Sequence, residues 1–266
     1  MSKLQKETAW TLILFVFTSV LFIASFPIQA AQQTSLSPRQ TADLLAALHS
    51  KEWLGRAHAY YQLIDNSSAM HQETTKSALI DLLNRENSSD PSEGRDYKPD
   101  DGEEYAEYIG SLVGTVAEVA DWKNSSQVCI IAHSPFDPDS ALAARLARTG
   151  QTVIPCLLEM AKNGSWTDRY QAVAVLIQVR ATVRELSANT SEEIRDATIR
   201  ALHDTHEMVR IGTVHALGRF GGTDMIPALQ KVAQTDPSPE VQGRSIRKAA
   251  ASAIAAIQKR AAQPNT

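Results

Sequence analysis

The sequence predicts an all-α protein built as an α-solenoid, in which antiparallel helix pairs stack side by side. Hydrophobic residues make up 43% of the 266 residues and aromatic residues only 6%, a composition that favours small side chains packed between helices. Apolar residues recur at three- and four-residue steps through most of the chain. Between residues 151 and 260 one pattern returns: a helix with Ile-Pro, an acidic turn, and a helix that opens on Val-Arg. Such a unit cannot bury both faces alone, so we expect an array.

The first 30 residues have the composition of an export signal. Lys3 and Lys6 give a basic start, an apolar run fills residues 10–26, and Ala30 provides a small residue for cleavage. We expect a mature chain that begins directly after this residue and is periplasmic or secreted, with residues 31–37 as a linker. The rival interpretation is an uncleaved anchor, because about 17 apolar residues reach the lower limit for a membrane span. Only in that case would a membrane be a partner.

Residues 38–148 are predicted as an N-terminal helical region. Apolar stripes at helical spacing predict helices near residues 38–49, 53–64, 70–85, 103–120 and 140–148, and the short apolar run 128–132 is expected as a further helix. Residues 86–104 have no apolar period and combine Ser, Pro and Gly with many acidic residues, which predicts a mobile loop. We interpret this loop as a solvated insertion; the functional alternative is an acidic segment that docks a partner or a cation.

The block 151–260 can be laid over itself. The Ile-Pro step at Pro155 recurs at Pro227, a separation of 72 residues, or two periods of about 36. Proline is tolerated in the first turn of a helix, so each of these prolines marks the entry of a first helix. In the second helices, Arg169 overlays Arg210 at a shift of 41 residues, and Arg210 overlays Arg247 at a shift of 37. The variation in spacing falls in the turns, where repeats accept insertions.

The units around Asp204 resemble a known family. Their shared pattern is an aspartate in the turn, Val-Arg five residues later and Ile-Pro after the second helix, carried by Asp204, Val209-Arg210, Ala216-Leu217-Gly218 and Met-Ile-Pro-Ala-Leu at 225–229. This pattern resembles the HEAT repeat, in particular its bilin-lyase-like subclass. The next unit starts in the same way at Asp236. The resemblance covers residues 151–257, is weaker over the preceding region, and specifies the fold much better than the function.

The resemblance implies structural roles for the repeated residues. In the family, the turn aspartate and the second-helix arginine contact each other across neighbouring repeats. By position, this implies Asp204 with Arg210 or an adjacent arginine, and Asp168 with Arg169. The positions expected to be scaffold are Pro155, Asp168, Arg169, Asp204, Val209, Arg210, Pro227, Asp236 and Arg247. None of them is a catalytic candidate.

The two cysteines gain meaning from the expected export. In an oxidising compartment, Cys129 and Cys156 can form one intramolecular disulfide. The alternative is two buried thiols on adjacent helices that act as small apolar side chains. Their separation of 27 residues matches neither a zinc motif nor a redox motif. A catalytic cysteine would need a base that the sequence does not identify.

Three histidines are candidates for a metal site, because His203, His206 and His215 lie near Asp204 and Glu207. The first two fall at a helix end and a turn, and the third lies nearly three turns along the next helix, so their spacing argues against a shared metal. We expect solvated histidines and no metal. The sequence also has no nucleophile elbow, phosphate-binding glycine loop or paired metal-ligand motif. We therefore assign no catalytic and no cofactor-binding residue.

The charge of the chain bears on its partners. The net charge is −4 and the pI about 6.0, so there is no basic field for nucleic acid. We expect an exported, monomeric scaffold that binds a protein or peptide on the concave face made by its second helices, without catalysis or cofactor, and with a disordered tail at 261–266. Two alternatives stay open: an enzyme or chromophore-handling protein related to bilin lyases, and a structural envelope protein held by an uncleaved signal.

Overall fold

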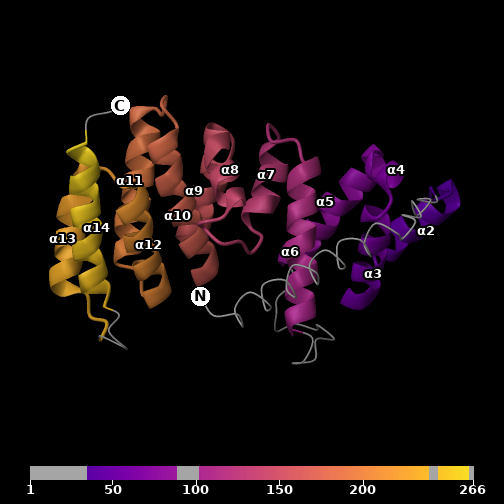
Figure 1. The fold of residues 1–266 in the computed structure, drawn as a ribbon, viewed down its shortest axis with the longest axis horizontal. Helices are drawn as coiled ribbons and strands as arrows, with labels where there is room; N and C mark the ends of the chain where they lie inside the picture. The colour runs from indigo at the N-terminus through magenta and orange to yellow at the C-terminus, as the bar shows by residue number, and fades with distance from the viewer. Residues whose placement is uncertain (1–34, 89–101, 240–244, 264–266) are drawn as a thin grey trace, which may run out of the picture.

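A computed structural model of the chain describes residues 35–88, 102–239 and 245–263. Within these ranges the protein is all-helical, with thirteen α-helices packed in adjacent pairs and no strand. The helices form an elongated array that runs from α2 at one end to α14 at the other (Figure 1). The predicted α-solenoid is therefore confirmed. The expected signal segment and most of the expected linker lie outside the described residues.

The N-terminal region contains α2 (Pro38–Ala47), α3 (Trp53–Ile64), α4 (Ser67–Met70), α5 (Glu73–Ser88), α6 (Gly102–Val119), α7 (Ser125–Ala132) and α8 (Ala141–Thr149). The repeat block contains η2 (Gly150–Thr152), α9 (Ile154–Asn163), α10 (Trp166–Thr182), α11 (Ala188–Leu202), α12 (Glu207–Phe220), η3 (Thr223–Met225), α13 (Ile226–Thr235) and α14 (Ile246–Ala261). The expected tail 261–266 therefore starts with a helical residue, and its last three residues lie outside the described chain.

The expected mobile loop at 86–104 is wrong at both of its ends. Helix α5 continues through Ser88, and α6 begins at Gly102. Glu86 is only 5% exposed, although its sequence context predicted a solvated segment. The physical reason is that this carboxylate has buried hydrogen-bond partners, which the local composition cannot reveal. The rest of the predicted loop, residues 89–101, lies outside the described chain.

Short polar side chains fix several helix starts. At α2, the Gln40 backbone N–H donates to Ser37 Oγ, and the Ser37 N–H donates to the Gln40 side chain, which is a capping box. Ser165 and Asp168 make the same reciprocal pair at the start of α10. These caps satisfy backbone donors that a helix leaves free at its first turn.

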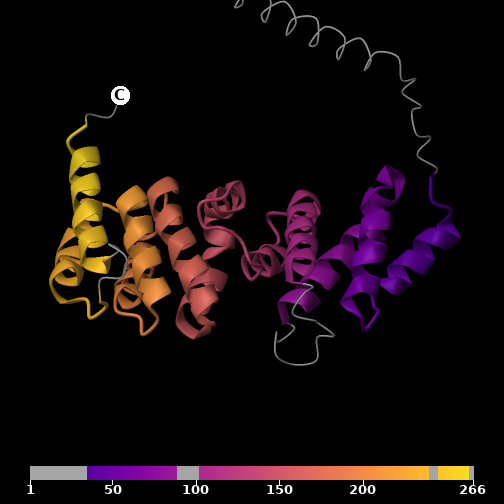
Figure 2. The ribbon, with the colours of Figure 1, turned by 60° about the horizontal axis from the view of Figure 1, so that its bottom comes forward.

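Three regular helix pairs make up the repeat block: α9 with α10, α11 with α12, and α13 with α14. Pro155 and Pro227 occupy the second positions of α9 and α13, each after a 3₁₀ turn, as predicted. The second helices α10, α12 and α14 lie side by side (Figures 1 and 2). Helices α10 and α12 approach closely because Gly212 has no side chain: a Cβ there would lie 2.0 Å from the Tyr170 ring.

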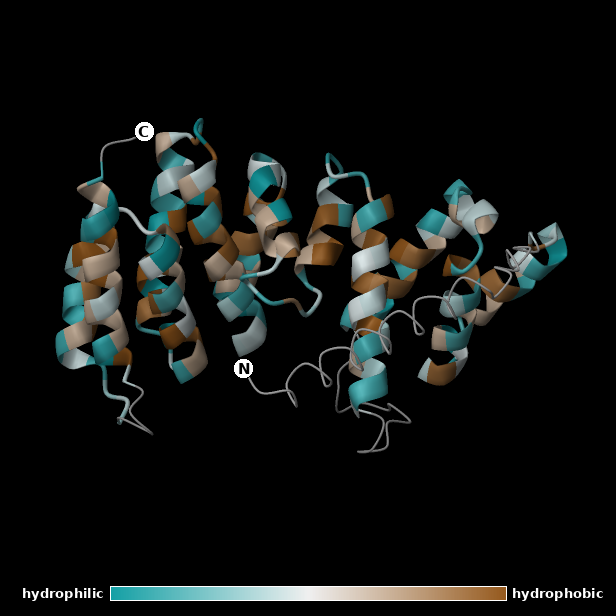
Figure 3. Ribbon diagram, viewed as in Figure 1, coloured by the Kyte–Doolittle hydropathy of each residue, from teal (hydrophilic) through white to brown (hydrophobic). Residues whose placement is uncertain are grey.

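The apolar core runs through the array as two clusters that meet at α10. One cluster spans residues 48–197 and the other residues 173–257. Most helices alternate hydrophobic and hydrophilic segments, as expected for helices that bury one side (Figure 3). Helix α10 differs, because residues 171–179 are all buried. Among the helices that the structure describes, none has both the length and the apolar character that a bilayer crossing requires.

Candidate functional site

An arginine in the fourth position of a helix links one helix pair to the next at three places in the array. These ladder arginines are Arg56 of α3, Arg169 of α10 and Arg210 of α12. Nη1 of each donates to backbone carbonyls just before its own helix. Nε of each lies close to a carboxylate of the following pair: 2.6 Å from Glu86, 2.7 Å from Asp204 and 2.8 Å from Asp236, in that order. Each guanidinium therefore fixes its own helix start against the next pair.

The ladder corrects one contact implied by the family resemblance. Asp168 does not pair with Arg169. Its carboxylate accepts hydrogen bonds from Ser165 N at 2.9 Å and Oγ at 2.6 Å, and it lies 3.9 Å from His133 Nδ1. Arg169 reaches Asp204 of the next pair instead. Contact across neighbouring repeats is thus confirmed for Asp204, with an adjacent arginine as its partner.

Arg210 and Arg247, which overlay in the sequence, have different partners. Arg210 is buried and donates to the Asp236 carboxylate and to Ser238 Oγ, while it meets Asp204 through the backbone carbonyl. Arg247 is exposed and donates to the backbone carbonyl of Asp236 at 3.0 Å. Burial tends to raise the pKa of Asp236, but hydrogen bonds from Arg210 and Ser238 outweigh it and hold this pKa below its usual range. Within the described parts of the chain, Arg247 thus adds no further carboxylate pair to the ladder.

The N-terminal member of the ladder was not predicted from the sequence. The Glu86 side chain is 1% exposed and accepts hydrogen bonds from Arg56 and from the hydroxyls of Tyr105 and Tyr108, at 3.0 and 3.3 Å. Burial first, and then the charge of Glu86, raises the pKa of Tyr108 well above its usual range. The signal that could have revealed this site is the arginine in the fourth position of a helix, as in α10 and α12.

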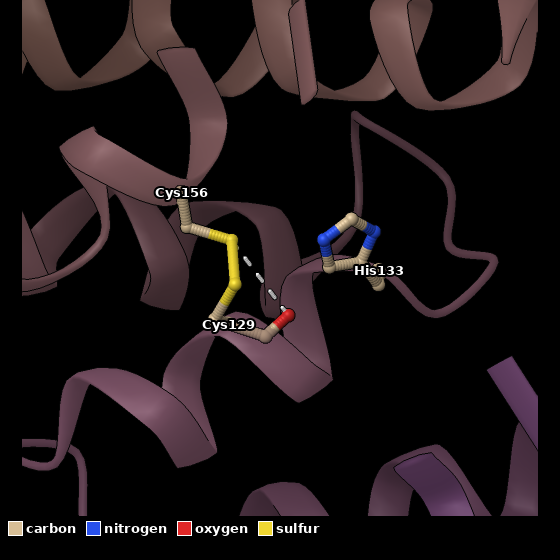
Figure 4. A group of neighbouring side chains, drawn as sticks. All are labelled: Cys129, His133 and Cys156. Atoms are coloured by element: carbon tan, nitrogen blue, oxygen red, sulfur yellow. Dashed lines mark hydrogen bonds between the residues drawn. A yellow bond between two sulfur atoms is a disulfide. The ribbon is translucent and has the colours of Figure 1, made fainter. Parts of the chain in front are cut away.

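Cys129 of α7 and Cys156 of α9 form a disulfide, with their Cα atoms 5.7 Å apart. The predicted pair is therefore present, and the alternative of two free thiols does not hold. His133 caps the C-terminus of α7 beside this disulfide (Figure 4). The ligand atoms of the three residues lie within 4.8 Å of one another.

The histidines considered as metal ligands do not form a cluster in the described part of the chain. His206 stacks on Trp166, with ring centroids 4.3 Å apart and planes at 9°. His203 lies at the C-terminal cap of α11, and His215 is exposed along α12. Sequence reasoning missed His133, whose place beside the disulfide depends on the packing of α7 against α9.

An irregular segment between α7 and α8 lies across α10, and we call its residues 134–139 the strap. Its backbone is held by two glutamine side chains of α10. Gln171 Nε2 donates to the carbonyls of Ser134 and Phe136 at 3.3 and 2.8 Å, and Gln178 Nε2 donates to the carbonyl of Pro138 at 2.8 Å. The glutamines are seven residues apart, so they lie on one side of the helix. The acceptors are backbone carbonyls of alternate strap residues. The two glutamines of α10 therefore bind the main chain of the strap and not its side chains.

Helix α12 continues this side of the array beyond the strap. Asp139 of the strap forms an ion pair with Arg219 of α12. On the same side of α12, Ile211 is half-buried and His215 is exposed. We call Ile211, His215 and Arg219 the open face. It presents an apolar side chain, an imidazole and a cation on successive turns.

A pocket of about 390 Å³ lies at the C-terminal ends of α10 and α12. Arg180 pairs there with Asp224 at 2.8 Å and donates to Ser191 Oγ at 3.3 Å. Among the described residues that line the pocket, Asp224 is the only carboxylate, and there is no histidine or cysteine. General acid–base catalysis by a pair of titratable groups therefore has no support in this pocket.

Residues 157–255 match the family model of HEAT repeats. The match runs from α9 into α14, where the regular helix pairs lie, and it supports a HEAT-repeat protein. No curated protein matches the sequence. The N-terminal region lies outside the matched residues, yet Arg56 makes there the same double contact as Arg169 and Arg210.

Proposed function

We propose that this protein is an exported, monomeric HEAT-repeat scaffold that binds a segment of a protein or peptide partner on the side of its second helices, without catalysis. The family match over residues 157–255 supports a repeat scaffold. Solenoids of this kind expose extended surfaces to which other polypeptides bind. Helices α10, α12 and α14 supply that surface here, and we take it as the concave face of the array.

The observation that carries this proposal is that the second-helix side already holds a polypeptide. Gln171 and Gln178 bind the strap through backbone carbonyls, the main-chain chemistry by which proteins hold extended peptides. The open face lies beside the strap on α12. We expect a partner segment along α12 to place an apolar side chain on Ile211 and a carboxylate near His215 and Arg219.

The proposed export rests on the sequence of residues 1–30, and the disulfide supports it because disulfides persist in oxidising compartments. N-terminal sequencing of protein purified from its native cell tests this point. Cleavage predicts a terminus at Ala31. A terminus at Met1 would contradict cleavage and would favour the anchored alternative.

Site-specific photo-crosslinking in the native cell tests the binding surface. A benzophenone side chain in place of His215 is expected to form an adduct with one defined partner. The matched control places the same group at Asp196, which is exposed on α11 among the first helices, and should form no such adduct. Arg219→Glu, added to the His215 variant, should reduce the adduct because it reverses the charge that we expect the partner to meet.

Three outcomes would contradict the proposal. Adducts of equal yield at His215 and Asp196 would mean that the second-helix side is not the binding surface. A covalent adduct or a stable colour change on incubation with a tetrapyrrole would replace the scaffold with the chromophore-handling alternative. Turnover of a small molecule by the purified protein would contradict the absence of catalysis.

A further inference from the structure

The cluster of Cys129, His133 and Cys156 lies apart from the open face and is not used by the proposed scaffold. One ring nitrogen of His133 is turned toward the disulfide (Figure 4). All three side chains offer their ligand atoms within 4.8 Å of one another. A disulfide by itself does not require an imidazole at this distance, so the arrangement has a feature that cross-linking does not explain.

The fold brings these residues together from two helices. Cys129 and His133 are four residues apart at the end of α7, which places them on the same side of that helix. Cys156 is the third residue of α9, which packs against α7. The two cysteines are half-buried and His133 is exposed, so a reductant and a metal ion can reach the cluster from solvent.

A carboxylate lies behind the imidazole. Nδ1 of His133 is 3.9 Å from Asp168 Oδ1, and Asp168 is itself held by Ser165 at the start of α10. Metal-binding histidines commonly direct one nitrogen at a carboxylate, which fixes the ring and the tautomer. The arrangement leaves Nε2 of His133 available as a ligand.

We propose that the reduced form of this cluster binds a zinc ion through the Cys129 and Cys156 thiolates and the His133 imidazole. Two thiolates and one imidazole are the ligand types that zinc prefers. The ligand atoms of a tetrahedral zinc site lie about 3.3–3.8 Å apart, given Zn–S and Zn–N distances of about 2.3 and 2.0 Å. After the S–S bond opens, the sulfurs need only separate by side-chain rotation to reach this spacing. Water fills the fourth position on the exposed side.

The step from disulfide to metal site is a thiol–disulfide exchange followed by metal binding. A dithiol reductant gives two electrons and two protons to Cys129 and Cys156, the S–S bond breaks, and the reductant becomes a disulfide. Zinc then displaces the two thiol protons, which leave to solvent, and accepts the lone pair of His133 Nε2. The cross-linked and the metal-bound states exclude each other, because a sulfur in an S–S bond is not a thiolate and cannot serve as a thiolate ligand.

Cobalt binding tests this proposal, since Co²⁺ occupies zinc sites and reports thiolate ligands by a charge-transfer band in the near ultraviolet. The purified protein is reduced with a phosphine without oxygen, freed of the reductant, and titrated with Co²⁺. We expect one Co²⁺ per chain, with a band that Zn²⁺ abolishes. The disulfide form is expected to show no band.

Two histidine variants assign the third ligand. His133→Ala is expected to weaken Co²⁺ binding of the reduced protein at least tenfold. The oxidised variant should keep its disulfide and its helical circular dichroism, because the side chain is exposed. His203→Ala is the matched control, since His203 is also exposed at a helix C-terminus, and should bind Co²⁺ like the wild type.

Equal Co²⁺ affinity of His133→Ala and the wild type would overturn the site, as would a reduced wild type without a stoichiometric thiolate band. Unfolding on reduction does not obscure the test. If reduction lowers the helical signal, Zn²⁺ is expected to restore it, because binding to the folded chain stabilises that chain. A signal that Zn²⁺ leaves unchanged in that case would also overturn the proposal.

Discussion

The N-terminal region and the repeat block hold their helix pairs together by the same arginine contact but in different surroundings. In the block, Arg169 and Arg210 reach a turn aspartate of the next pair. In the N-terminal region, Arg56 reaches Glu86 inside a helix, among two tyrosine hydroxyls. The disulfide joins this region to the repeat block, from α7 to α9. The ladder thus persists where the regular spacing of the repeats is lost, with a helical glutamate and two tyrosine hydroxyls in place of the turn aspartate.

Removal of Glu86 should give the largest effect, because its partner is buried. Glu86→Ala leaves the Arg56 guanidinium, whose side chain is 10% exposed, without its carboxylate. We expect the free energy of unfolding to fall by about 3–5 kcal/mol. The control is Glu73→Ala, which removes an 87% exposed carboxylate from a pair with Lys76 and should change stability by less than about 1 kcal/mol. Urea denaturation measures both. Similar losses for the two variants would mean that burial does not make the Arg56–Glu86 pair stronger than an exposed pair.

The second largest difference between the regions should come from the close packing of second helices in the repeat block. Gly212→Ala places a Cβ against the Tyr170 ring between α10 and α12, and is expected to cost about 1–3 kcal/mol. Gly110→Ala in α6 meets nothing within 4 Å and should stabilise the protein by about 1 kcal/mol through helix propensity. Thermal denaturation gives the sign of each change. A stabilised Gly212→Ala would mean that α10 and α12 are not packed as closely as described.

The strap belongs to the N-terminal region and contacts α10 and α12 of the repeat block, so it joins the two regions. Gln178→Ala removes the amide that binds the Pro138 carbonyl and should cost about 1 kcal/mol. Faster hydrogen exchange of residues 134–139 should accompany it. Gln230→Ala, an exposed change on α13, is the control and should alter neither quantity. Unchanged exchange in Gln178→Ala would show that this glutamine does not hold the strap.

Acid should weaken the repeat block through its ladder carboxylates, with the smallest effect. The hydrogen bond from Arg169 is the main cause that holds the pKa of Asp204 below its usual range. The Asp204 carboxylate therefore binds a proton more readily in the unfolded chain than in the folded one. The stability that the Arg169–Asp204 pair contributes is present above pH about 4 and is lost as the pH falls through the pKa of Asp204 in the folded chain. Asp204→Asn should show a shallower loss of stability between pH 5 and 2. Urea midpoints across this range test it, and an unchanged slope would contradict the pairing.

The sequence predicts the repeat block better than the N-terminal region for a physical reason. Pro155, Pro227 and the second-helix arginines recur at a nearly constant spacing, and a periodic pattern reveals a fold whose contacts are periodic. Glu86 stands shortly before Ser, Pro and Gly residues, so its local context indicates a loop. Its burial in α5 depends on Arg56 and on two tyrosine hydroxyls, which lie outside that local context.

The strap could not be predicted either, because it depends on tertiary contacts. Gln171 and Gln178 lie within a run of nine buried helical residues, where polar side chains give no periodic signal. The cysteine pair was foreseen as one of two alternatives, since two thiols in one chain permit a single intramolecular bond. The place of His133 beside this pair follows only from the packing of α7 on α9.

In the proposed function, the side of the second helices, and not that of the first helices, contacts the partner. Hydrogen exchange of the protein with and without the partner captured at His215 tests this claim most directly. We expect slower exchange in α10, α12 and residues 134–139, with α9, α11 and α13 unchanged. Protection confined to α9, α11 and α13 would contradict it.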